Sequence, residues 1–155
     1  MVAFAWLTHI ISWFLPVVKL GGSHSELFSP IRGWFAFRIA LSPIWPYENF
    51  HVDHWYNSVL SVASAATTIL FIVSPWVVWR KSQGVLKACA WVSSAAFILN
   101  AHWYILFGSD RKQLSVGYFF WWLSFILLAI GLFGLSRNRV VNEIPEGQAD
   151  LETGC

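Results

Sequence analysis

The stretch from residue 56 to residue 79, YNSVLSVASAATTILFIVSPWVVW, decides the fold class. It contains no charged residue, and its length matches the roughly 20 residues that a helix needs to cross a bilayer core. Tyr56 and Trp79 stand at its two ends, as expected of aromatic belts at the membrane interfaces. Arg80 follows directly, and Pro75 should kink the helix or mark its last turn, because the ring removes a backbone hydrogen bond. The stretch predicts a transmembrane helix.

Three further apolar stretches cover residues 2–18, 85–107 and 116–135. The first lacks the basic start and the small-residue cleavage site of a signal peptide, so we expect a retained helix. Short links join the last three stretches, which makes them antiparallel neighbours. The sequence therefore predicts an all-α polytopic membrane protein built as a bundle of four transmembrane helices.

The composition of the 155-residue chain supports this class. Hydrophobic residues make up 57% and charged residues 12%, whereas a soluble domain carries about 25% charged residues. The net charge of +2 comes without a cluster of cations, which argues against a nucleic-acid partner. Two cysteines cannot form a disulfide framework. The lipid bilayer is the expected partner.

The link over residues 19–55 is long, and such links are usually functional or structured. Within it, Ser29 followed by Pro30 is typical of a helix start, with Ser as N-cap and Pro in the first turn. Residues 31–41 are mostly apolar and end just before a proline. They predict a short helix that lies at the interface or folds back onto the bundle.

The positive charges at the ends of the stretches suggest an orientation. With the N-terminus inside, each side of the membrane receives half of the 10 Lys and Arg residues. The cytoplasmic half lies directly at the ends of the stretches, without acidic neighbours. We therefore expect both termini inside and residues 19–55 outside, in a plasma or inner membrane. Residues 142–155 form a polar, acidic tail that we expect to be disordered.

Histidines supply a candidate metal site. His51, Asp53 and His54 lie just before the second stretch, and His102 lies near the end of the third. Because these stretches are antiparallel, the four side chains face the same side of the membrane, and imidazoles with a carboxylate suit Zn, Fe or Cu. The alternative interpretation is structural and simpler: Asp53 caps the second helix, and His102 bonds between helices. The sequence alone does not identify a cofactor.

Two more polar residues, His9 and Asn100, lie inside the predicted spans. His9 stands near the middle of the first stretch and needs a partner, for which the hydroxyls of the second stretch or Asn100 are the candidates.

Small residues, among them Gly131 and Gly134 of the fourth stretch, predict close helix packing. Gly33, in the long link, is interpreted as a turn residue.

The long link also carries a candidate anion site. We expect Arg38 to pair with the carboxylate of Glu48, Asp53 or Glu26 and to pin the link onto the bundle. The alternative is a site for a lipid headgroup or another anion, formed by Arg32 and Arg38 beside Trp34 and Trp45.

Three functions of different classes stay open. No hydrolase, zinc-protease or phosphate-loop motif is present, so no catalytic residue is assigned. The leading hypothesis is a non-enzymatic accessory or structural subunit of a membrane complex or homo-oligomer, because 11 Trp and 13 Phe exceed what four helices bury against each other. The second is a metal- or haem-dependent membrane oxidoreductase. The third is a binder or carrier of a lipid or quinone, with the aromatic link from Trp34 to Trp45 as the lid over an interfacial pocket.

Overall fold

The computed structural model describes residues 1–19, 30–46, 55–80, 82–106 and 108–142, and it is mostly helical. In chain order its elements are α1 (Val2–Phe14), β1 (Pro16–Val18), β2 (Ile31–Arg32), α2 (Gly33–Ala40), α3 (Trp55–Thr67), α4 (Ile69–Arg80), α5 (Gln83–Asn100), α6 (His102–Leu106), the 3₁₀ helix η2 (Gly108–Gln113) and α7 (Val116–Asn142).

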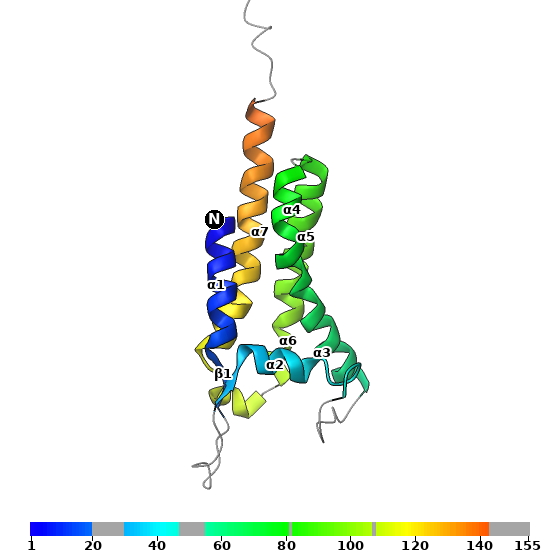
Figure 1. Cartoon of the computed structure of the whole chain (residues 1–155), viewed down its shortest axis with the longest axis vertical. Helices are drawn as coiled ribbons and strands as arrows, with labels where there is room; N and C mark the ends of the chain where they lie inside the picture. Colours follow the sequence, from blue (N-terminus) through cyan, green and yellow to red (C-terminus); the bar gives the residue numbers. More distant parts are fainter. Residues whose placement is uncertain (20–29, 47–54, 81, 107, 143–155) are drawn as a thin grey trace, which may run out of the picture.

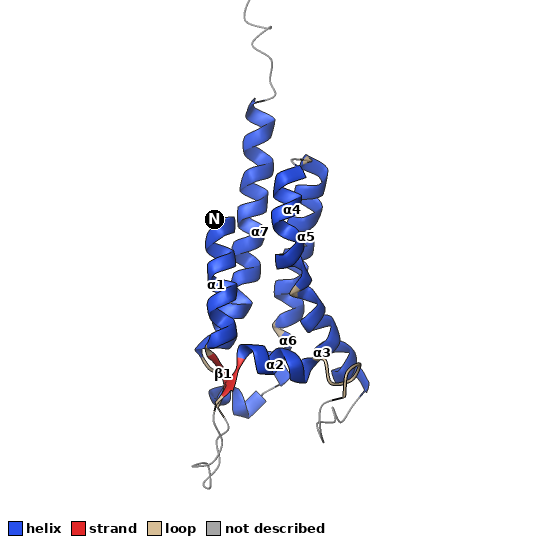
Figure 2. Ribbon diagram, in the orientation of Figure 1, coloured by secondary structure: helices blue, strands red, loops and turns tan. Residues whose placement is uncertain are grey.

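The long helices run in alternating directions (Figure 1). In that view α1 descends beside α7, α3 and α4 ascend, α5 and α6 descend, and α7 ascends past the others. Helix α7 is central, since it packs against both α1 and α5. Helix α2 lies across the lower end of the bundle, next to the short strands drawn in red in Figure 2.

Within the described residues, three helical stretches are long and apolar enough to cross a membrane: Trp55–Arg80, Gln83–Leu106 and Val116–Asn138. They agree with the last three predicted spans. The first predicted span is shorter than expected, because α1 has 13 residues. At 1.5 Å per residue it extends over about 20 Å, against a hydrocarbon core of about 30 Å. At the other end of the chain, α7 continues past residue 135 because arginine ends an apolar span but remains a good helix former.

The prediction of a helix over residues 2–18 is wrong after Phe14. Leu15 has extended backbone angles, as the residue before a proline prefers, and Pro16 begins β1. Strand β1 pairs with β2 in antiparallel fashion, and Val18 forms a bridge to Leu114. These backbone hydrogen bonds tie the end of α1 to the start of α7 and of α2.

The predicted start of the short helix is also wrong. Helix α2 begins at Gly33, with Arg32 in extended conformation before it, so Pro30 is not in its first turn. A Cβ atom on Gly33 would lie 2.4 Å from the carbonyl oxygen of Ser12 and 2.8 Å from the Cα atom of Trp13. Gly33 therefore allows α2 to pack directly on α1, and its interpretation as a turn residue is corrected.

The helix over residues 55–80 is interrupted at Thr68, not at Pro75, through which α4 continues. The Thr67 hydroxyl donates a 2.6 Å hydrogen bond to the Ser64 carbonyl, which is the acceptor that the Thr68 N–H would use in an α-helix. The Thr68 N–H bonds instead to the Ala65 carbonyl at 3.1 Å. Local competition by a threonine hydroxyl thus accounts for the break.

Glycines also bring α1 and β1 close to α7. A Cβ on Gly117 would lie 2.6 Å from the Pro16 carbonyl oxygen, and one on Gly131 would lie 2.8 Å from Cγ2 of Val2. Close packing is confirmed for Gly131. It is wrong for Gly134, where an added Cβ would meet no atom of another element within 4 Å in the described part of the chain.

Candidate functional site

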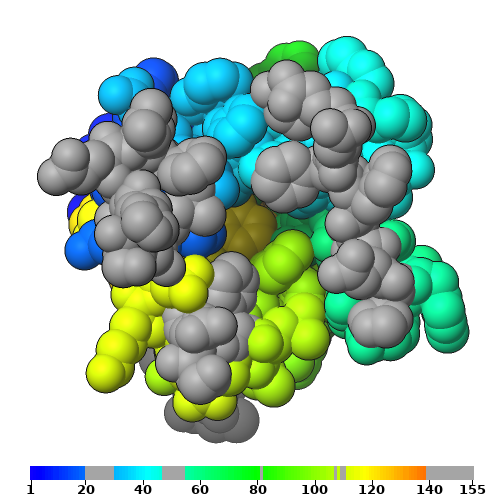
Figure 3. Space-filling model, turned by 90° about the horizontal axis from the view of Figure 1, so that it is seen from below, coloured from blue at the N-terminus to red at the C-terminus, as the bar shows by residue number. Residues whose placement is uncertain are grey.

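The lower end of the bundle contains a cavity of about 330 Å³ that opens to the surface. Figure 3 looks onto this end and shows it hollowed near the centre, with α7 visible at depth. Its wall comes from α1, both strands, α2, α3, α6, η2 and α7. Five aromatic side chains line it: Trp13, Phe37, Trp103, Tyr118 and Trp121.

A hydrogen-bonded network lies beside this cavity and joins α3, α5, α6 and α7. Asn100, at the end of α5, is fully buried. Its Oδ1 accepts a 2.6 Å hydrogen bond from the Ser64 hydroxyl, and its Nδ2 donates to Thr67 Oγ1 at 3.1 Å. The Trp103 indole N–H donates to Ser64 Oγ at 3.0 Å, and the Tyr118 hydroxyl donates to the Asn100 carbonyl at 2.9 Å. The network fixes Trp103 and Tyr118 as walls of the cavity.

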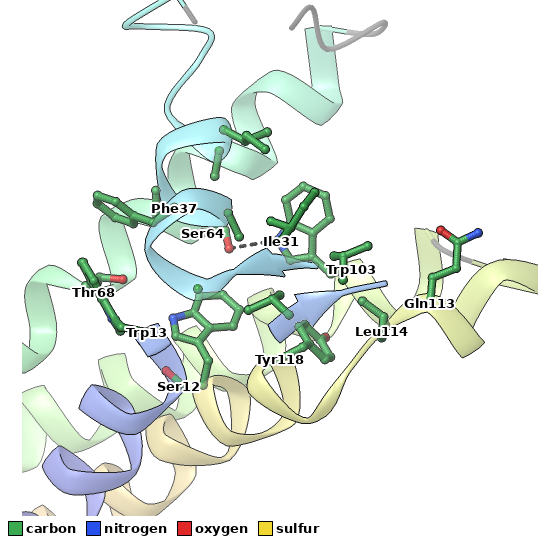
Figure 4. Close-up of a pocket in the computed structure, with 18 residues that line it drawn as sticks. Ser12, Trp13, Ile31, Phe37, Ser64, Thr68, Trp103, Gln113, Leu114 and Tyr118 are labelled. Carbon is green, nitrogen blue, oxygen red and sulfur yellow. Dashed lines mark hydrogen bonds between the residues drawn. The ribbon is translucent and has the colours of Figure 1, made fainter. Parts of the chain in front are cut away.

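Figure 4 shows how these side chains surround the space. Trp13 and Tyr118 stand on one side of it, Phe37 and Ile31 on the other, and the dashed line joins Trp103 to Ser64.

Helix α2 closes the cavity along one side. Phe37 packs on Trp13, with ring centroids 5.3 Å apart. The Arg38 guanidinium donates to the carbonyls of Trp45 and Pro46 at 2.7 and 3.2 Å and lies 4.2 Å from the centroid of the Trp45 ring. These contacts hold α2 and the turn after it as one unit.

The structure places the residues of the predicted anion site on this unit. Arg32, Trp34 and Trp45 are exposed. Arg38 donates to backbone carbonyls. The carboxylates expected to pair with it, those of Glu26, Glu48 and Asp53, lie outside the described residues.

His9 is buried and bonds to a different helix from the one predicted. Its Nδ1 lies 3.1 Å from Ser124 Oγ on α7, and the Trp13 indole N–H donates to its Nε2 at 3.3 Å. Because Trp13 can only donate, Nε2 accepts and Nδ1 carries the proton. The imidazole also stacks on Phe71, with centroids 3.8 Å apart. The ring therefore orients Trp13 at the cavity wall, and the expected partners on the second span and Asn100 are corrected.

Of the candidate metal ligands, only His102 is among the described residues; His51, Asp53 and His54 are not. His102 Nδ1 donates to the Leu99 carbonyl at 2.6 Å, and its buried Nε2 has no partner in the described part of the chain. No group of three His, Cys, Asp or Glu side chains that could hold a metal occurs within the described ranges.

The cavity-lining residues Trp13, Ser64, Thr68, Trp103 and Tyr118 were not identified from the sequence as one site. They come from four segments that meet only in the folded chain, so no local spacing signals them. The aromatic residues of the long link were the one usable signal, since they led to the expectation of a lid over a pocket.

Comparison with known proteins adds no relative. No family model matches the chain, no curated protein matches it, and no solved structure matches it.

Proposed function

We propose that this chain is an integral membrane protein whose cavity binds a small, uncharged, apolar molecule at the membrane interface. The observation that carries the proposal is the cavity itself. Its volume of about 330 Å³ is roughly twice that of an engineered apolar cavity, about 150 Å³, that binds benzene. Apolar cavities with a few polar groups are the usual form of ligand sites.

The lining determines the charge of the ligand. Among the residues that the structure describes, none of the side chains that line the cavity is charged, and most are aliphatic or aromatic. An ionised ligand would lose its hydration there without a compensating partner, which costs several kcal/mol. An uncharged ligand meets no such penalty.

The proposed location in the membrane also supports the binding of an apolar ligand. In our proposal Trp55–Arg80, Gln83–Leu106 and Val116–Asn138 cross the bilayer, and α1 lies along α7 inside it. Exposed Trp and Phe side chains then face lipid, so they do not by themselves require a protein partner. The accessory-subunit hypothesis stays a prediction, as does the metal site.

Filling the cavity tests the proposal. Ala65 lines it, whereas Ala66 is the next residue on α3 and is exposed. We expect the detergent-solubilised protein to bind 2,3-dimethylnaphthalene, measured by titration calorimetry against empty micelles. Ala65→Phe should weaken this binding at least tenfold, because the new ring occupies the cavity, and Ala66→Phe should leave it within twofold. Absence of saturable binding by the unaltered protein, or equal binding by Ala65→Phe, contradicts the proposal.

A further inference from the structure

Thr68 is the polar residue of the cavity wall that the fold leaves without a hydrogen bond. Its side chain is 6% exposed, and Oγ1 has no partner among the residues that the structure describes. A buried hydroxyl without a partner costs free energy, so such a group calls for an explanation. In Figure 4 the Thr68 hydroxyl is drawn on the side of the residue that faces the cavity.

The break between α3 and α4 lies directly at this hydroxyl. A threonine in a helix normally donates to a carbonyl three or four residues earlier. For Thr68 these carbonyls belong to Ala65 and Ser64, which accept from the Thr68 N–H and from Thr67 Oγ1, and Thr68 Oγ1 bonds to neither of them. Among the described residues, Thr68 Oγ1 is therefore an unpaired hydroxyl in the cavity wall.

Three other hydroxyls of the wall are already paired. Ser12 Oγ donates to the His9 carbonyl, Ser64 Oγ donates to Asn100, and the Tyr118 hydroxyl donates to the Asn100 carbonyl. The amide side chain of Gln113 is half-exposed. A ligand with one hydrogen-bond acceptor would therefore pair the Thr68 hydroxyl without breaking these bonds.

The aromatic walls favour a flat ring over a flexible chain. Trp13, Phe37, Trp103, Tyr118 and Trp121 line the space, and flat rings pack on aromatic side chains by stacking or edge contacts. We propose that the cavity takes an uncharged, carbonyl-bearing ring compound of the quinone class, whose carbonyl oxygen accepts a hydrogen bond from Thr68 Oγ1. This inference rests on the proposed function and narrows its ligand.

A matched pair of probes tests it. The probes are 2,3-dimethyl-1,4-naphthoquinone, whose methyl groups block the ring positions that thiols attack, and 2,3-dimethylnaphthalene, which has the same ring without carbonyls. Binding to the full chain in detergent is measured by titration calorimetry. We expect Thr68→Val to weaken quinone binding about tenfold through loss of one buried hydrogen bond. Hydrocarbon binding should change by less than twofold.

Two further variants serve as controls. Thr8→Val removes another buried hydroxyl, which bonds only to the Phe4 carbonyl of its own helix, and should alter neither affinity. Thr68→Ser keeps the hydroxyl and should retain quinone binding, which also separates the hydroxyl from folding defects in Thr68→Val.

The outcomes distinguish the two claims. If both probes bind and Thr68→Val leaves quinone affinity unchanged, this inference is overturned while the apolar-ligand function stands. If the hydrocarbon binds and the quinone does not, the inference fails in the same way. If neither probe binds the unaltered protein, the proposed function fails as well.

Discussion

Gly33 has no side chain, and this absence determines how closely α2 approaches α1. The carbonyl oxygen of Ser12 occupies the space that a methyl group would need. Because that neighbour is backbone, it cannot move aside by rotation of a side chain. The position of α2 over the cavity therefore depends on this one residue.

We expect Gly33→Ala to destabilise the protein by about 1–3 kcal/mol, the usual range for overpacking a well-packed contact. Thermal unfolding in detergent measures the change, and binding of 2,3-dimethylnaphthalene should weaken with it, since α2 lines the cavity. Gly134→Ala is the control: it has open space around it and should be neutral or stabilising by up to about 1 kcal/mol. Equal stability of the two variants would show that α2 does not pack on α1 in this way.

Among the helices, Asn100 is the main polar link between α3 and α5. Both ends of its amide are bonded to α3, and its backbone carbonyl accepts from α7. Bonds between membrane helices contribute modestly, about 0.6 kcal/mol on average and up to about 1.7 kcal/mol.

We expect Asn100→Ala to lower the free energy of unfolding by about 1–3 kcal/mol, because two interhelical bonds are lost and a small void is left. The Trp103 and Tyr118 rings should become less ordered, which tryptophan fluorescence anisotropy would report. Ser94→Ala removes a hydroxyl that bonds only within α5 and should change stability by less than about 0.5 kcal/mol. A loss for Asn100→Ala no larger than for Ser94→Ala would contradict the role assigned to the network.

The sequence predicts the long elements better than their interruptions. Continuous apolar runs define the helices over 55–80, 83–106 and 116–138 to within a few residues. The break at Thr68 depends on which hydroxyl captures a carbonyl, and composition does not reveal that choice. The short strands are similar: Pro16 signals the end of α1, but pairing with residues 31–32 and with Leu114 arises from contacts distant in the chain.

At the scale of the whole molecule, the alternating helices place the end of α4 and η2 at opposite ends of the bundle (Figure 1). If the long helices cross the membrane, Ser82 and Gly108 lie on opposite sides of it. In a background with Cys89 and Cys155 replaced, Ser82→Cys should react with a membrane-impermeant maleimide only from the cytoplasm. Gly108→Cys should react only from outside. Labelling of both cysteines from one side would contradict the spanning arrangement, and the reverse pattern would invert the expected orientation.

The cavity forms only where several helices and both strands meet in the folded chain, so the sequence alone could not predict it. Its wall combines the end of α1, the strands, α2, the α3–α4 break and the start of α7. The pairing of His9 with Ser124 is likewise a contact between the first and last helices. Aromatic composition suggested a lid, whereas the space beneath it follows from how all the helices meet.

Native mass spectrometry of the protein, gently extracted from its own membrane, tests the central claim most directly. We expect the unaltered chain to carry one bound small molecule, the Ala66→Phe variant to carry the same added mass, and the Ala65→Phe variant to lose it. A bare chain mass in the unaltered protein, or the same added mass in all three proteins, would contradict a ligand held in the cavity beneath α2.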